Sequence, residues 1–254
     1  MDRLAFNAVV AINEQRTARQ MTTNELANVS TPGFKRSFEA AMQAVKVEGP
    51  GFNSRMQPQA FTSDFINMKP GTPMSTGRDL DVAFNDLTVL GVTGQDGKLA
   101  FTRRGDLRVN ASGALETGAG HLVQGQGGAP ITIPPGLMVT VSPDGSVFAT
   151  DPSKVGVTSS VAVGKLLMRD ASKTNLERNE AGLYRVAGVA AGQDISGGTK
   201  VTSLTSRTLE GSNVNAMEVM VKMMAQSRSF EQQVNMIKES KQIDESGASM
   251  MKSS

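Results

Sequence analysis

Cysteine and tryptophan are absent from this 254-residue sequence, and tyrosine and histidine occur once each. Without cysteine the chain has no disulfide, no thiolate nucleophile and no cysteine-ligated metal site. Aromatic residues make up only 4% of the chain. Because aromatic side chains supply much of the area buried in a large core, we expect thin or elongated domains.

Long apolar runs and a strong charge of either sign are also missing. No run of about 18 consecutive apolar residues occurs, so we expect no membrane-spanning helix. The N-terminus carries Asp2 and lacks the apolar run of a cleavable signal peptide. The net charge of +2 does not indicate a basic surface that would bind nucleic acid or membranes. These absences predict no nucleic-acid partner, no membrane insertion and, for an exported protein, export without a cleavable signal.

The N-terminal segment, up to about residue 29, contains no glycine or proline and has small or apolar residues at spacings of four and three. This periodicity predicts one long helix with a broad stripe of small residues. The stripe consists of Leu4, Ala8, Ala11, Ala18, Thr22 and Val29, with Ala5, Ile12 and Leu26 in an adjacent row.

The predicted helix stops within the stretch LANVSTPGFKR. Thr31 precedes a proline and is therefore expected to be extended. Pro32 fixes its own φ and Gly33 can supply the positive φ of a type II turn, so Phe34 follows as an apolar anchor. We expect the helix to end at about Asn28 and the turn to direct the chain away from it.

The middle of the sequence, residues 75–207, is rich in turns and has the alternation of β-strands. Asp-Gly and Ser-Gly sequences between alternating runs predict β-hairpins, because glycine and asparagine adopt positive φ readily. The expected turns are Gln95–Gly97, Asn110–Gly113 and Pro143–Gly145, and further strand candidates are Gly164–Asp170 and Gly182–Gly188. Short antiparallel strands at this spacing predict a β-rich domain.

The C-terminal region, Ser212 to about Ile243, again lacks glycine and proline. Its apolar residues keep a four-three spacing over three heptads, which predicts a coiled-coil seam or a helix packed along its whole length. The seam positions are Ala216, Met220, Met223, Ser227, Phe230, Val234 and Ile237. Ser212 or Asn213 is expected to cap the first turn by accepting from free amides.

Together these patterns predict an α+β fold in which long N- and C-terminal helices enclose an all-β antiparallel central domain. The chain only enters the β domain from one helix and leaves it into the other, so neither helix can bury its stripe against that domain. We therefore expect the helices to pair as a coiled-coil-like module, with each other or with helices of other subunits. The expected domains are residues 1–34 with 208–254 as the helical module, 35–74 as an extended linker, and 75–207 as the β-rich domain.

Several stretches carry a resemblance to a known family. LANVSTPGFKR near the start and LEGSNVNAMEVMVKMMAQSRSFEQQVNMI near the end resemble the two terminal signatures of flagellar rod and hook axial proteins. TGRDLDVA, FTRRGDLRVNASGALETGAGHLVQG and ITIPPG resemble the β domain of the longer members. The sequence is most similar to proximal rod proteins that have a β-rich central domain. It departs from them at Phe84–Val89. Family members usually carry a glycine-rich segment followed by an aromatic residue after LDVA, and this stretch has neither that glycine nor a tryptophan.

The resemblance implies a non-enzymatic structural subunit of the bacterial flagellar basal body, located in the periplasmic rod. It implies that the terminal helices polymerise around a channel, that the turn at Pro32–Phe34 joins two layers, and that the rod transmits torque to the hook and filament. The implied partners are copies of the chain, proximal and distal rod proteins, and the flagellar export apparatus. A distal rod or hook-type axial protein is the nearest alternative.

Two other classes of protein are alternatives on the sequence. An enzyme would need convergent acid, base or metal-binding groups, and the single His121 has no HExxH or GxSxG motif around it. Asp79 and Asp81 are not followed by the rest of a calcium loop. We therefore predict no catalytic residue, no metal and no cofactor. The second alternative is a secreted β-domain binding module, such as an adhesin or a carbohydrate-binding domain, with helices for oligomerisation.

Overall fold

A computed structural model of the chain describes residues 2–37, 42–46, 56–60, 65–152, 160–196 and 198–252. The chain divides into two compact units. The helical unit comprises Met1–Asn28, Glu39–Ser63 and Asn215–Ser254, and the β unit comprises Val29–Phe38 and Asp64–Val214.

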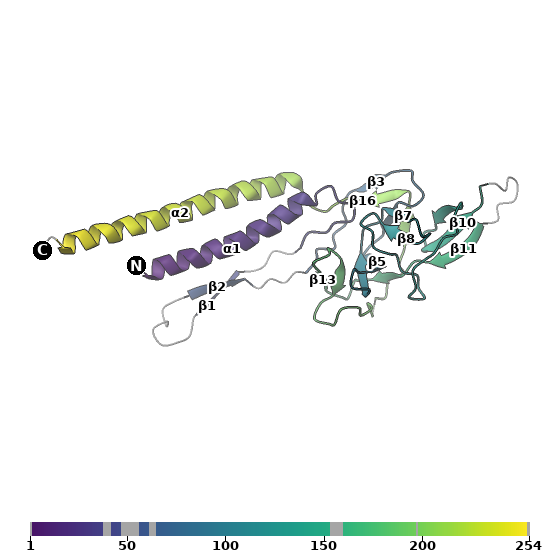
Figure 1. Ribbon diagram of the computed structural model, residues 1–254, viewed down its shortest axis with the longest axis horizontal. Coiled ribbons are helices and arrows are strands. Elements are labelled where there is room, and N and C mark those ends of the chain that lie inside the picture. Colours follow the sequence, from purple (N-terminus) through teal and green to yellow (C-terminus); the bar gives the residue numbers. More distant parts are fainter. Residues whose placement is uncertain are drawn as a thin grey trace. The chain divides into compact units, whose positions relative to one another are not determined.

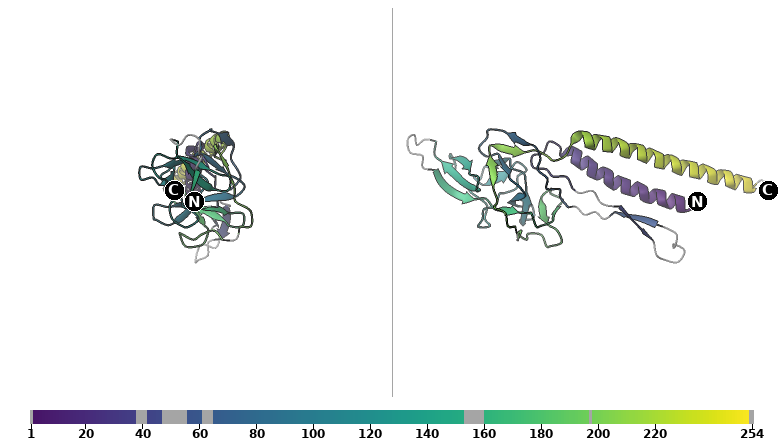
Figure 2. Two further views of the ribbon diagram at one scale, coloured as in Figure 1. Left: turned by 90° about the vertical axis from the view of Figure 1, so that its right-hand side faces the viewer. Right: turned by 180° about the vertical axis from the view of Figure 1, so that it is seen from behind.

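The helical unit contains two long helices that lie side by side and run antiparallel (Figure 1, Figure 2). Helix α1 spans Asp2–Ala27, and helix α2 spans Ala216–Lys252. An antiparallel pair of strands, β1 (Met42–Lys46) and β2 (Met56–Ala60), belongs to the same unit. In the described part of the chain, neither helix combines the length and the apolar character that crossing a bilayer would need.

The start of α2 differs from the sequence-based expectation. Its cap is Asn215, whose Oδ1 accepts from the amides of Met217 at 3.0 Å and Glu218 at 3.3 Å. An asparagine in this position satisfies amides that have no partner within the helix. Ser212 and Asn213, the two expected caps, lie before the helix and belong to the β unit.

The expected coiled-coil-like module is wrong, because the described residues contain no long coiled-coil pair. α1 has 26 residues and α2 has 37, and the expected seam residues Met220 and Phe230 stay 43% and 41% exposed. An α1 stripe in which half of the residues are alanine offers little apolar area to bury. The helices instead meet through polar groups, since Gln226 donates to Thr22 and Gln15 donates to the Gln226 carbonyl. The expected β-rich middle of the chain is confirmed.

The β unit is built from short antiparallel strands in several small sheets (Figure 1). Its strands are β3 (Pro73–Ser75), β4 (Val82–Phe84), β5 (Thr88–Thr93), β6 (Leu99–Thr102), β7 (Leu107–Val109), β8 (Leu115–Thr117), β9 (Met138–Val141), β10 (Ser146–Thr150), β11 (Ser160–Lys165), β12 (Met168–Asp170), β13 (Leu176–Arg178), β14 (Tyr184–Val186), β15 (Leu204–Ser206) and β16 (Thr208–Glu210). The largest sheet has the order β12-β5-β6-β14-β13, and a second has the order β11-β10-β9. Two-stranded pairs are formed by β4 with β15, β3 with β16, and β7 with β8.

The three hairpins expected from turn sequences are confirmed. β5 pairs with β6, β7 with β8, and β9 with β10. Their turns contain Gly97, Gly113 and Gly145, which have φ values of 73°, 82° and 85°. Each turn therefore uses the left-handed conformation that glycine adopts at little cost.

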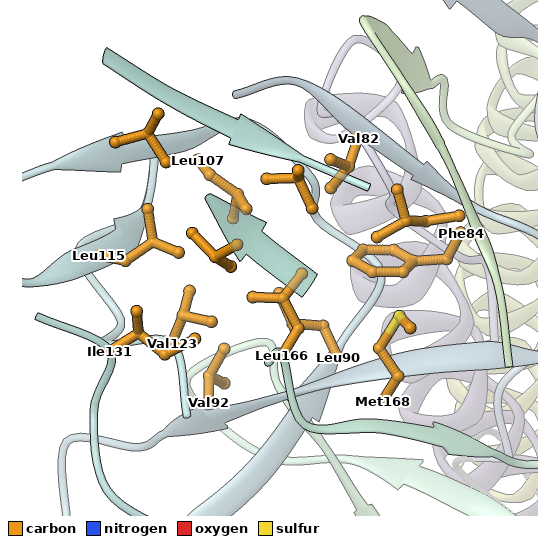
Figure 3. Close-up of a cluster of buried hydrophobic side chains, with 14 of the residues drawn as sticks. Val82, Phe84, Leu90, Val92, Leu107, Leu115, Val123, Ile131, Leu166 and Met168 are labelled. Carbon is orange, nitrogen blue, oxygen red and sulfur yellow. The ribbon is translucent and has the colours of Figure 1, made fainter. Parts of the chain in front are cut away.

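Two buried apolar clusters lie on opposite sides of β5. Val89 belongs to the smaller cluster, whereas Leu90 and Val92 belong to the larger one, as the alternation of side chains along a strand requires. Figure 3 shows side chains of the larger cluster, contributed by several strands, pointing toward one another. The smaller cluster includes Phe101 and Tyr184. Because both faces of β5 are buried, the strand is a rigid support for the loops around it.

Candidate functional site

The turn at Thr31–Phe34 is the first part of the candidate site. The Phe34 amide donates to the Thr31 carbonyl at 3.3 Å, and Gly33 has a φ of 69°. With Pro32 at its second position, this is a type II turn. A Cβ at Gly33 would lie 2.2 Å from the carbonyl oxygen of Arg103. The turn therefore requires glycine both for its conformation and for space.

Lys35, which follows the turn, is buried in an ion pair with Glu210. Its Nζ donates to Glu210 Oε1 at 2.5 Å and to the Lys69 carbonyl at 2.9 Å. The side chains of Lys35 and Glu210 are 0% and 5% exposed. The backbone joins the same segments, since the Gly33 amide donates to the Glu210 carbonyl at 2.7 Å. The segment after the turn is thus held against β16, which ends at Glu210.

Arg103 is a second buried cation on the same carboxylate. Its Nε donates to Glu210 Oε2 at 2.7 Å, and its side chain is 1% exposed. Its guanidinium also donates to the carbonyls of Phe84, Asp86 and Thr88. Arg103 directly follows β6, and these carbonyls surround the connection from β4 to β5. The arginine therefore links the central strands to Glu210.

Asp86 lies in the turn that lacks the glycine expected from the family. It has a positive φ of 48°, and the Thr88 amide donates to the Asn85 carbonyl across the turn at 3.1 Å. Aspartate tolerates the left-handed region better than most residues. The turn is therefore kept without glycine, and the Asp86 carbonyl still accepts from Arg103.

Lys35, Arg103 and Glu210 form what we call the buried ion cluster. Buried charges are costly unless each is paired and hydrogen-bonded, and here backbone groups complete the pairing. The Gly71 amide, for example, donates to Glu210 Oε1 at 3.0 Å. Burial, and next the Arg103 guanidinium, lower the pKa of Lys35 from 10.5 to about 8, whereas Glu210 acts in the opposite direction. At neutral pH the lysine is therefore still mostly protonated.

Asn213 connects the segment after β16 to the segment after the turn. Its Oδ1 accepts from the Arg36 amide at 2.7 Å, and its Nδ2 donates to the carbonyls of Asn67 at 2.8 Å and Lys69 at 3.1 Å. The Asn213 amide also donates to the Phe34 carbonyl at 3.2 Å. One asparagine therefore holds three stretches of backbone together.

Tyr184 and Arg178 pack against the turn from the five-stranded sheet. The Tyr184 hydroxyl donates to the Gly33 carbonyl at 3.2 Å, and burial raises the pKa of Tyr184 to about 12. The Arg178 guanidinium lies 4.3 Å from the centre of the Phe34 ring, a cation–π contact. Arg178 also donates to the Lys35 carbonyl. The turn is thus fixed on both of its sides.

The site has the chemistry of a structural joint. Among the described residues, no group of three or more histidine, aspartate or glutamate side chains could hold a metal ion. Asp79 and Asp81 pair separately, with Arg207 at 2.6 Å and Arg78 at 2.8 Å. His121 takes no part in the buried ion cluster, and burial followed by the Arg104 guanidinium lowers its pKa. What the cluster does is hold residues 33–36 beside residues 210–213.

Comparison with known proteins identifies the family. The model described as "Flagellar hook protein FlgE/F/G D1 domain" matches residues 89–149, and the model described as "Flagellar basal body rod FlgEFG protein C-terminal" matches residues 205–250. The flagellar basal-body rod protein FlgF of Salmonella typhimurium is 35% identical over 239 residues, which cover 93% of each chain. The chain belongs to the flagellar basal-body rod proteins. FlgF of Escherichia coli is 34% identical over 93% of each chain, and FlgG of Bacillus subtilis is 28% identical over 96% of this chain and 97% of its own.

The resemblance seen in the sequence is thereby confirmed, and this rod protein is a structural subunit of the flagellar rod. The comparisons do not favour the alternatives of a distal rod or hook-type protein or a secreted binding module. Arg103 lies within the first matched region and Glu210 within the second. Two members of the buried ion cluster therefore lie in regions that the family models describe.

The residues expected to form the assembly surface of this rod protein lie on α1 and α2. Leu4 is in α1, but its side chain lies outside the described residues. The half-buried positions are Ala11, Ile12, Leu26, Ala216, Met223, Val234 and Ile237, and the exposed positions are Met220 and Phe230. Their role in assembly stays a prediction.

Sequence reasoning selected the turn but missed all three members of the buried ion cluster. Each nevertheless lies in a stretch that carried the resemblance: Lys35 in LANVSTPGFKR, Arg103 in FTRRGD and Glu210 in LEGSNV. Each is also within two residues of a glycine. The sequence did hold a signal. Two basic residues and one acidic residue each lie near a glycine, where backbones can approach closely, and their charges are opposite.

Proposed function

We propose that this subunit polymerises through its terminal helices in the flagellar rod, in a segment most like the proximal one, and helps to transmit torque to the hook and filament. The buried ion cluster supports this proposal most directly. It holds the connection that follows α1 in the sequence beside the connection that precedes α2. A subunit loaded through both ends of its chain needs these connections fixed, because a loose connection would absorb strain by local unfolding.

The surface of α2 supports a role in contacts with neighbouring subunits. Its exposed large apolar side chains are Met217, Met220, Val221, Met224, Phe230, Met236 and Ile243. Met217, Met220, Val221 and Met224 recur at i, i+3, i+4 and i+7 and therefore share one face of α2. An exposed apolar patch is typical of an interaction site, and methionine adapts to slightly different neighbours because its side chain is unbranched. We propose that copies of this chain and other rod proteins cover these residues, together with the half-buried positions predicted from the sequence.

The proposed location is the basal-body rod in the periplasm, reached through the flagellar export apparatus without a cleavable signal peptide. The FlgF and FlgG names of the relatives support a basal-body location. A chain without cysteine is also compatible with passage into an oxidising compartment. The proposed role is mechanical and needs no catalytic residue or cofactor.

Substitution of Phe230 tests the role of α2 in assembly. In cells that lack the native gene, Phe230→Asp should abolish motility and remove the chain from purified basal bodies, because it places a charge in a subunit contact. Asn235→Asp adds the same charge at an exposed polar position of α2 and should leave both unchanged. Circular dichroism of the purified variants checks that the β unit is still folded. Normal incorporation of Phe230→Asp would refute the assignment of this surface.

A further inference from the structure

The sequence contains two Asp-Gly pairs, at residues 96–97 and 144–145, and each lies in the turn of a β-hairpin. Aspartate followed by glycine rearranges readily without an enzyme, because glycine has no side chain to hinder attack by its nitrogen on the aspartate carboxyl carbon. Gly97 and Gly145 both adopt a left-handed φ, of 73° and 85°. Each glycine amide also donates to the carbonyl three residues earlier, at 3.1 and 2.9 Å. In sequence and in turn conformation the two pairs are therefore alike.

The two carboxylates differ in how they are held. Asp144 Oδ1 accepts from the Ser146 amide at 3.2 Å, its Oδ2 accepts from the Ser146 hydroxyl at 2.7 Å, and Lys165 Nζ lies 3.3 Å from Oδ2. The hydroxyl and then the amide of Ser146 lower the pKa of Asp144. In the described part of the chain, the Asp96 carboxylate has a single hydrogen bond, from the Lys98 amide at 3.1 Å. Ring closure proceeds from the protonated carboxyl group, so bonds that favour the ionised form slow the reaction at Asp144.

The two glycines also differ in their surroundings. A Cβ built on Gly145 would lie 2.5 Å from Met168 Cε, and the Gly145 carbonyl accepts from the Leu166 amide at 2.8 Å. A Cβ built on Gly97 would meet no described atom within 4 Å, and residues 95–98 are exposed. Ring closure requires the peptide between aspartate and glycine to rotate toward the carboxyl carbon. The packed turn at Gly145 resists that rotation, whereas the open turn at Gly97 permits it.

We propose that Asp96 is a site of spontaneous isoaspartate formation in the folded chain and that Asp144 is protected from the same reaction. The Gly97 nitrogen bonds to Asp96 Cγ, and the protonated carboxyl group loses its hydroxyl, which leaves with the amide proton as water. The succinimide ring then takes up one water. Where that water breaks the bond between the nitrogen and the main-chain carbonyl carbon, the backbone continues through Cβ and Cγ as isoaspartate. No enzyme, metal or oxidant is needed.

The modification alters the central sheet of the β unit. Asp96 lies at the tip of the β5–β6 hairpin, and Arg103 of the buried ion cluster directly follows β6. Isoaspartate adds one backbone carbon to the turn, so the pairing of Thr93 with Leu99 at the end of the hairpin should loosen. The inference goes beyond the proposed role in the rod and does not depend on it, since it concerns the chemistry of the single chain.

Ageing of the purified full-length protein in water enriched in the heavy oxygen isotope tests the proposal. Each passage through the succinimide places a heavy oxygen at the site, and mass spectrometry of the peptides locates it. Methylation by an isoaspartate-specific carboxyl methyltransferase then quantifies the product. The folded chain should acquire label and isoaspartate severalfold faster at Asp96 than at Asp144. In guanidinium chloride, which removes both turns, the two sites should react at comparable rates.

Asp96→Glu is the matched control, because it keeps the charge while its longer side chain closes the ring far more slowly; it should abolish labelling of this peptide. Ser146→Ala should accelerate labelling at Asp144 and leave Asp96 unchanged, and no acceleration would overturn the role given to the Ser146 hydroxyl. Hydrogen exchange in β5, β6 and β10 shows that the variants are folded. The proposal is overturned if the folded chain reacts equally at both sites, or if Asp96 reacts only in guanidinium chloride.

Discussion

Replacing Glu210 with glutamine should destabilise the β unit by roughly 3–5 kcal/mol, the range observed when one partner of a buried ion pair is removed. The carboxylate accepts from Lys35 at 2.5 Å, from Arg103 at 2.7 Å and from the Gly71 amide at 3.0 Å. Glutamine keeps one acceptor oxygen but turns an amide donor toward one of these donors. Two positive charges then remain buried without an anion to balance them.

Loss of a proton from Lys35 limits this penalty. The pKa of Lys35 is already lowered to about 8 by burial and then by Arg103, against the opposing effect of Glu210. Without the carboxylate it should fall further, so the lysine becomes neutral more easily. The destabilisation by Glu210→Gln should therefore be largest near neutral pH and smaller at pH 9, which distinguishes an electrostatic cause from a packing defect.

Urea unfolding of the full chain measures the effect. The chain has one tyrosine and no tryptophan, so tyrosine fluorescence reports on Tyr184, whose hydroxyl donates to Gly33 in the site. Asp79→Asn is the control, because it breaks an ion pair with Arg207 whose side chains are 34% and 64% exposed; it should cost less than about 1 kcal/mol. If Glu210→Gln costs no more than Asp79→Asn, the buried ion cluster does not hold the site together.

Four further outcomes are expected in the same unfolding assay. The unfolding free energy should rise by about 2 kcal/mol between pH 8 and 10, because Lys35 has a pKa of about 8 when folded and 10.5 when unfolded. Over this range the unfolded chain binds the additional proton. Lys35→Met should remove this rise. Above pH 10 the trend should reverse, because burial raises the pKa of Tyr184 from 10.0 to about 12 and the unfolded chain then loses its proton first. Gly33→Ala should cost more than about 2 kcal/mol, since it adds strain at positive φ and a Cβ 2.2 Å from the Arg103 oxygen; a smaller cost would mean that the turn can rearrange. Asp86→Gly should stabilise the chain by up to about 1 kcal/mol. It relieves left-handed backbone strain of about 1–2 kcal/mol, which exceeds the cost of about 0.5–1 kcal/mol from the flexibility that glycine adds to the unfolded chain. A loss of stability would show that Asp86 is not strained.

The parts of the fold that the sequence predicted are those decided by neighbouring residues. The hairpin turns at Gly97, Gly113 and Gly145 need a residue that adopts positive φ between two alternating runs, and both signals are local. The type II turn at Pro32 and Gly33 is local in the same way. The long helices at the two ends also follow from uninterrupted helix-forming sequence.

The buried ion cluster was beyond prediction because its members are far apart in the chain. Lys35 and Glu210 are separated by 175 positions, and Arg103 and Glu210 by 107. No local pattern indicates which of the 26 basic residues is buried. The expected coiled-coil pairing failed for a related reason, since it counted only small and apolar residues. Thr22 was included in the stripe, but Gln226, whose side chain donates to it, was not among the seam positions.

Purified basal bodies give the most direct test of the central claim that this chain is a structural subunit of the flagellar rod. Quantitative mass spectrometry of detergent-washed basal bodies, from cells that produce the chain, should recover peptides of both the β unit and α2 in amounts comparable to those of other rod proteins. Absence of the chain from intact basal bodies, in cells that contain it elsewhere, would contradict the account.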